Sequence, residues 1–157
     1  MQGNVAIRSY YLLSEALESS LLNNNITKTV TIGDVSDVDL GKQSIFPLAH
    51  FIVNNVVSTQ QTLVYNITVL VMDIKDTSKS EETDKFRKNT DEQDILNTQL
   101  GVLNKLIQTL RFGDLNTTGY KLTNDPTCEP FVDRFENNLA GWNADLEIEL
   151  PNDQYIC

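Results

Sequence analysis

Residues 60–74 read QQTLVYNITVLVMDI, and this stretch decides the fold because it is long, rich in β-branched residues and apolar on two alternating faces. One face carries Leu63, Tyr65, Ile67, Val69 and Val71, and the other carries Val64, Asn66, Thr68, Leu70 and Met72. Residues 46–57 predict a second strand, with Pro47 near its start, where a missing N–H costs least. Only a short polar link separates the two runs, which predicts an antiparallel hairpin.

Three more strands are expected on either side of this hairpin, at 27–32, 128–135 and 142–150, with a turn at 137–141. Apolar residues at helical spacing predict one helix over 5–23 and a second one over 90–111. The order is therefore helix, three strands, helix and two strands. It predicts an α+β fold in which an antiparallel sheet of about five strands carries two helices on one face.

The second helix has the clearest signals at its ends. Thr90 and Gln93 match a capping box, and Gly113 is a plausible C-terminal cap. Gly101 lies inside the helix, where glycine is costly; either another backbone packs closely there or the glycine occurs by chance. The expected core consists of Leu17, Val53, Ile67, Val69, Leu100, Leu103, Leu106, Ile107, Trp142, Leu146 and Ile148.

Length and charge restrict the class of protein. The 157 residues predict a single domain over 1–157, and 22 acidic against 12 basic residues give a formal net charge of −10. This balance disfavours proteins that bind nucleic acid through phosphates or adhere to anionic membranes. No apolar run is long enough to span a bilayer, and Ser14 and Glu15 interrupt the only stretch that resembles a secretory signal. We therefore expect Cys128 and Cys157 to be reduced thiols in a protein made in a cytosol.

Candidate chemical sites are few. The one histidine, His50, lies in an apolar strand, where a hydrogen-bonded core residue is the favoured interpretation, and no motif supports a Cys128–His50 nucleophile pair. Asp34, Asp37 and Asp39 lack the spacing of a calcium loop, and the sequence offers no standard zinc ligand set or phosphate-binding glycine pattern. We expect no catalytic residue, no metal and no cofactor.

Residues 75–89 are charged and almost devoid of apolar side chains, which predicts a long exposed loop. Mixed charges favour capture of a neighbouring subunit over phosphate binding, and the long strand before the loop could add to a neighbour's sheet. The candidate intersubunit contacts are Lys75, Asp76, Lys79, Glu81, Glu82, Lys85, Phe86 and Arg87. In the acidic loop 33–43, Asp34, Asp37 and Asp39 are candidates for a second contact or for the lining of a lumen.

Four segments carry a resemblance to a known class: FPLAHFIV (46–53), YNITVLVMDI (65–74), DILNTQLGVLNKL (94–106) and FVDRFENNLAGW (131–142). They resemble the tail terminator and neck (head–tail completion) proteins of tailed bacteriophages, such as crAss-like phages that infect Bacteroidetes. The resemblance implies a tail-terminator-like fold and a virion structural protein, made in the bacterial cytoplasm. It further implies a ring of sixfold or twelvefold symmetry that contacts portal, neck and tail proteins. DNA would pass through this ring without specific binding.

Two other classes stay open. An accessory module could bind another protein through an exposed sheet edge without forming a ring. An enzyme that uses His50 is the least favoured class, and we expect that the chain is not an enzyme.

Overall fold

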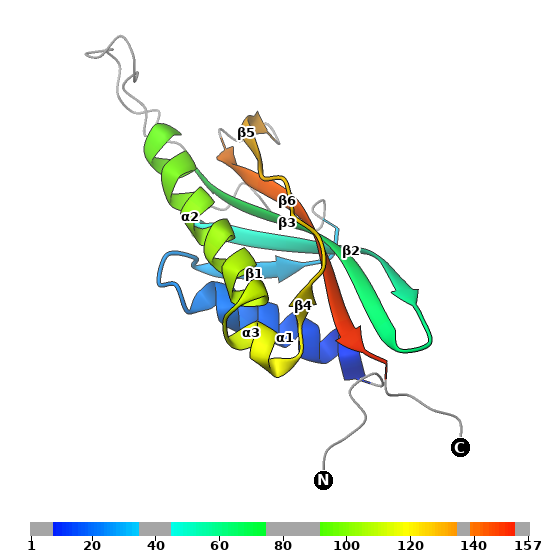
Figure 1. The fold of residues 1–157 in the computed structure, drawn as a ribbon. Coiled ribbons are helices and arrows are strands. Elements are labelled where there is room, and N and C mark those ends of the chain that lie inside the picture. Colours follow the sequence, from blue (N-terminus) through cyan, green and yellow to red (C-terminus); the bar gives the residue numbers. More distant parts are fainter. Residues whose placement is uncertain (1–7, 35–44, 75–91, 135–138, 153–157) are drawn as a thin grey trace, which may run out of the picture.

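The computed structural model describes residues 8–34, 45–74, 92–134 and 139–152, which form a sheet with two helices on one face (Figure 1). The chain is α+β, as predicted, but the sheet is mixed and has six strands. In chain order the elements are α1 (Ser9–Leu22), β1 (Thr29–Ile32), β2 (Leu48–Ser58), β3 (Thr62–Ile74), α2 (Glu92–Arg111), α3 (Asp114–Thr118), β4 (Lys121–Leu122), β5 (Glu129–Arg134) and β6 (Leu139–Pro151).

The predicted hairpin is confirmed and forms the centre of the sheet. β2 and β3 are antiparallel, and Thr59 closes the turn because its hydroxyl accepts a hydrogen bond from the Thr62 N–H at 2.9 Å. β6 pairs antiparallel with the other side of β3 along its whole length. β1 pairs parallel with β2, so the expectation of a purely antiparallel sheet was wrong. Because both strands run the same way, the end of β1 and the start of β2 lie at opposite ends of the pair.

The C-terminal half departs from the prediction in detail. Residues 114–124, where the sequence predicted neither a helix nor a strand, contain the short helix α3, which Gly119 caps (φ 115°), and the sixth strand β4. β6 begins at Leu139, three residues before the predicted start, so Gly141 lies inside a strand and not in a turn. The proposed cap at Thr90 lies outside the described residues.

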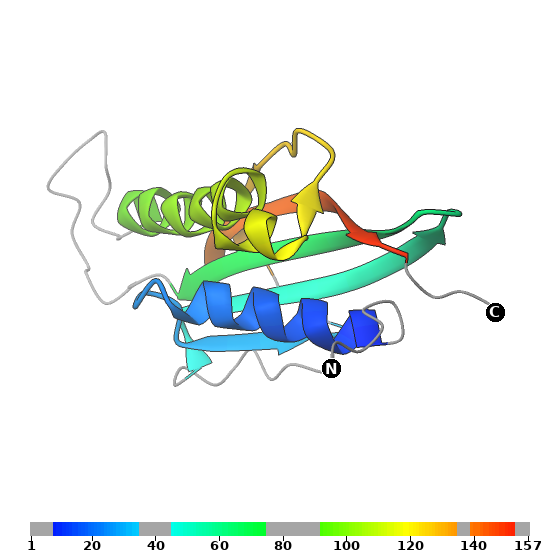
Figure 2. The same ribbon diagram turned by 60° about the horizontal axis from the view of Figure 1, so that its bottom comes forward.

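The main core lies between the helices and the sheet (Figure 2). Most of the predicted core is confirmed as buried: Leu17, Ile67, Val69, Leu103, Leu106, Ile107, Leu146 and Ile148. Val53 and Trp142 are partly buried against it. Leu100, however, is exposed, because it lies on the outer face of α2. Gly101 lies beside it, and no atom stands within 4 Å of where its Cβ would be, so the predicted close backbone contact was wrong.

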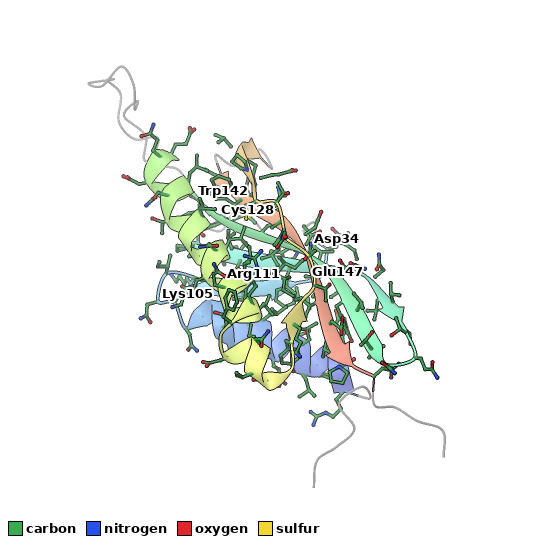
Figure 3. The ribbon with its side chains drawn as sticks, viewed as in Figure 1. Asp34, Lys105, Arg111, Cys128, Trp142 and Glu147 are labelled. Atoms are coloured by element: carbon green, nitrogen blue, oxygen red, sulfur yellow. The ribbon has the colours of Figure 1, made fainter. Side chains whose placement is uncertain are left out.

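Polar contacts fix both helices onto the sheet. The Trp142 indole N–H donates to the Leu96 carbonyl of α2 at 2.7 Å (Figure 3), and the Ser9 hydroxyl of α1 hydrogen-bonds the buried Tyr65 hydroxyl. A second, smaller cluster covers part of the opposite face of the sheet. It contains Phe46, Leu48, Leu70, Met72, Phe131 and Leu139.

Candidate protein-interaction edge

The strand β2 has two halves with different neighbours. Its first half is paired on both sides, by β3 and by β1, and the pairing with β1 stops at Ile32 and Phe51. From residue 52 to Ser58, β3 is the sole neighbour among the strands that the structure describes. We call residues 52–58 the free half of β2. Outward-pointing N–H and C=O groups of such an edge can template a further strand.

This position differs from the predicted one. The sequence suggested that the strand over 60–74 would offer its edge to a neighbour, but β3 is internal, because β2 and β6 pair with its two sides. The edge that is open in the described structure belongs to β2, the hairpin partner of β3. Figure 1 shows the β2–β3 hairpin reaching beyond the helices at the lower right.

The hairpin carries no charged side chain before Asp73, near the end of β3. The whole stretch 43–72 contains no Asp, Glu, Lys or Arg, although charged residues make up 22% of the chain. Residues 54–61 are all exposed, and the side chains of Val56 and Val57 are 40% and 50% exposed. Water-exposed valines favour contact with another chain when they lie next to backbone groups that no described strand pairs.

The opposite edge of the sheet is protected. β5 contains Pro130, which has no N–H to offer, and it starts with the charged Glu129. β4 is only two residues long and begins with Lys121. The free half of β2 has neither a charge nor a proline. Its one irregularity is a β-bulge between Val53 and Asn55.

Side-chain hydrogen bonds hold the free half of β2 in place on the face of the sheet away from the helices. The Asn54 amide donates to the Thr68 hydroxyl (2.8 Å), which donates to an Asp145 carboxylate oxygen (2.6 Å), so three strands are joined. The Asn66 amide donates to the Asn55 amide oxygen at 2.6 Å. All of these residues except Thr68 line a shallow pocket of about 260 Å³. Its other lining residues are Ile67, Asn124, Leu146 and Glu147.

Asn152, the residue that follows β6, holds the tip of the β2–β3 hairpin in place. The Asn152 amide donates to the Thr59 carbonyl at 2.9 Å, and its backbone N–H donates to the Gln61 carbonyl at 2.9 Å. The free half of β2 is thus a preformed edge, which lowers the entropic cost of adding a strand to it.

His50 is fully buried in the first half of β2 and joins it to β1. Its Nε2–H donates to the Gly33 carbonyl at 2.7 Å, and its Nδ1 accepts from the Thr31 hydroxyl at 2.7 Å. Burial lowers the pKa of His50, against the opposing effects of the Gly33 carbonyl and the Asp34 charge. The predicted hydrogen-bonded core histidine is confirmed.

Cys128 is not a partner for this imidazole. It packs against the main core on the helix side of the sheet, whereas His50 shares the other face with Leu48 and Leu70. Burial raises the pKa of the Cys128 thiol, although the nearby Arg111 acts in the opposite direction. A thiol with a raised pKa is a poor nucleophile at neutral pH.

The predicted contact residues fall largely outside the described structure. Asp34 is exposed beside His50, whereas Asp37 and Asp39 lie outside the described residues. The same holds for every candidate in the charged loop, from Lys75 to Arg87. The free half of β2 was missed. The uncharged run 43–72 is the signal it leaves in the sequence, and this run does not by itself distinguish an exposed edge from a buried one.

In the four described ranges, no three His, Cys, Asp or Glu side chains gather where they could hold a metal ion. Among the described helices, none combines the length and the apolar character that crossing a membrane requires. The sequence matches no protein-family model, and a search of curated proteins finds no similar sequence.

Proposed function

We propose that this chain is a structural virion protein that assembles into a ring in the neck or tail of a tailed phage, around the DNA channel. The observation that carries the proposal is the free half of β2. It is an exposed, uncharged and preformed strand edge, and strand addition is a common way for one chain to hold another. The resemblance of the four segments to neck proteins supplies the virion context.

The charge distribution supports the same function. A net charge of −10 repels DNA, which suits a ring through which DNA passes without being held. The same charge makes copies repel each other, so they should meet where charge is absent. Heterologous contacts between copies close into a ring when the rotation per subunit is right.

The oligomeric state of the purified full-length chain tests this proposal. We expect higher oligomers by light scattering and native mass spectrometry as the protein concentration rises, and closed rings in electron micrographs of those fractions. A chain that stays monomeric at every concentration, and forms no ring when mixed with portal and tail proteins, would refute it.

An accessory protein-binding module is the second candidate, because the same edge could accept an extended segment of an unrelated protein. In that case the chain stays monomeric alone and binds its partner with one-to-one stoichiometry. Native mass spectrometry of the chain with and without neck proteins distinguishes the two functions.

A further inference from the structure

We infer that the free half of β2 pairs with the same stretch of a second copy of this chain, antiparallel and across a two-fold axis. The inference rests on the proposed self-assembly and adds which surface is used and what occupies it. The pairing joins the two sheets into one. A two-fold contact alone makes only pairs, so a ring built from these pairs closes through a second, heterologous surface of each copy and has dihedral symmetry.

Electrostatics favours a second copy at this place. Two chains that each carry −10 repel one another, and the repulsion is weakest where neither presents a charge. The free half of β2 provides such a surface, because no acidic or basic residue occurs between 43 and 72. The charges that line the neighbouring pocket, Asp145 and Glu147, belong to β6, which β3 separates from β2. A contact between this edge and the protected β5 edge would instead bring Glu129 and Pro130 into the ladder.

We place the two-fold axis at Val56, the middle residue of the stretch between the bulge and the end of β2. Residues 54–58 lie at and beyond the irregularity near Asn54, and an axis through Val56 places Val56 opposite its own copy. Asn55 then lies opposite Val57, and Asn54 opposite Ser58. Residues directly opposite in an antiparallel pair share a face, and this register satisfies that condition. It also covers Val56 and Val57, which are 40% and 50% exposed in the single chain.

A cysteine at the axis tests the register directly. Directly opposite residues in an antiparallel pair have Cα atoms about 4.5–5.5 Å apart, within the range that a disulfide spans. In a background with Cys128→Ser and Cys157→Ser, we expect Val56→Cys to form a covalent dimer under mild oxidation. Val132→Cys is the matched control, because Val132 on β5 is 39% exposed, almost the same as Val56. It should remain monomeric in a denaturing gel.

A lysine pair provides the second measurement. Val56→Lys places two ammonium groups opposite each other and should weaken self-association by roughly tenfold or more in sedimentation equilibrium. Val132→Lys changes the net charge equally and should change the association constant less than about twofold, because solvent-exposed charges far from the contact are screened.

The outcomes separate this inference from the proposed function. If rings form but Val56→Cys gives no covalent dimer, or if Val56→Lys associates as well as Val132→Lys, the two-fold contact is wrong and the ring function stands. If the unmodified chain does not self-associate at any concentration, the two-fold contact is wrong. The proposed function fails with it only if portal and tail proteins also induce no ring.

Discussion

Three glycine-to-alanine substitutions should change the stability of this chain in three different ways, and Gly141→Ala should have the largest effect. Gly141 lies in β6 opposite Met72 of β3. A Cβ at this position would stand 1.9 Å from the Val71 carbonyl oxygen and 2.8 Å from the Met72 Cα. Both are backbone atoms of the central strand, so no side chain can rotate away to make room.

The magnitude follows from these distances. Ordinary contacts of a Cβ are 3.4–4 Å, so β3 and β6 would have to separate locally by about 1.5 Å. A hydrogen bond of about 2.9 Å does not survive such a separation, and each lost one costs roughly 1 kcal/mol. With the strain of overpacking added, we expect Gly141→Ala to lower the free energy of unfolding by about 3 kcal/mol or more.

The two other glycines are the controls. No atom lies within 4 Å of a Cβ at Gly101, which is exposed in the middle of α2, so Gly101→Ala should stabilise by about 0.5–1 kcal/mol through helix propensity. Gly119 has equal space but a φ of 115°, so Gly119→Ala should cost about 1–2 kcal/mol from backbone strain alone.

Urea denaturation followed by circular dichroism measures all three, at a protein concentration low enough that the midpoints do not depend on it. The slopes should stay equal while the midpoints rank Gly101→Ala above the unmodified chain and Gly119→Ala and Gly141→Ala below it. A Gly141→Ala protein within about 1 kcal/mol of the unmodified chain would refute the close approach of β3 and β6.

His50 and Gln99 provide two further tests. Burial lowers the pKa of His50, so the unfolded chain binds more protons than the folded one. His50 therefore contributes stability above its unfolded pKa of about 6.5, and this stability is lost as the pH falls toward the folded value. In this range the urea midpoint should depend more steeply on pH for the unmodified chain than for His50→Gln, and equal slopes would contradict the proton linkage. Gln99 on α2 is 2% exposed, and in the described part of the chain its side-chain amide has no hydrogen-bond partner. Gln99→Leu should therefore raise the free energy of unfolding by about 1 kcal/mol. An unchanged or lower urea midpoint would contradict this reasoning.

The sequence predicted elements better than it predicted their neighbours. Alternation over residues 60–74 and helical spacing over 90–111 located β3 and α2, because both patterns record which face of an element is buried. The parallel pairing of β1 with β2 could not be predicted, because direction within a sheet depends on the path of the connecting chain. Gly101 and Gly141 were misinterpreted for a related reason: a close backbone approach depends on the neighbouring element, and local spacing does not record it.

The difference between local pattern and neighbouring elements also explains why the sequence did not locate the candidate edge. Whether a strand is internal depends on segments far away in the sequence, and β3 has no open side because β6 pairs along its whole length. The charge pattern, in contrast, is present in the sequence, but a run without charges indicates a buried hairpin as readily as an exposed one. Only the strand pairing and the charge pattern together single out residues 52–58 as an edge that is both open among the described strands and uncharged. Proteins usually protect open edges with lysine or proline, as β4 and β5 do here with Lys121 and Pro130. The lack of such protection on β2 is a physical reason to expect that another chain covers it in the working assembly.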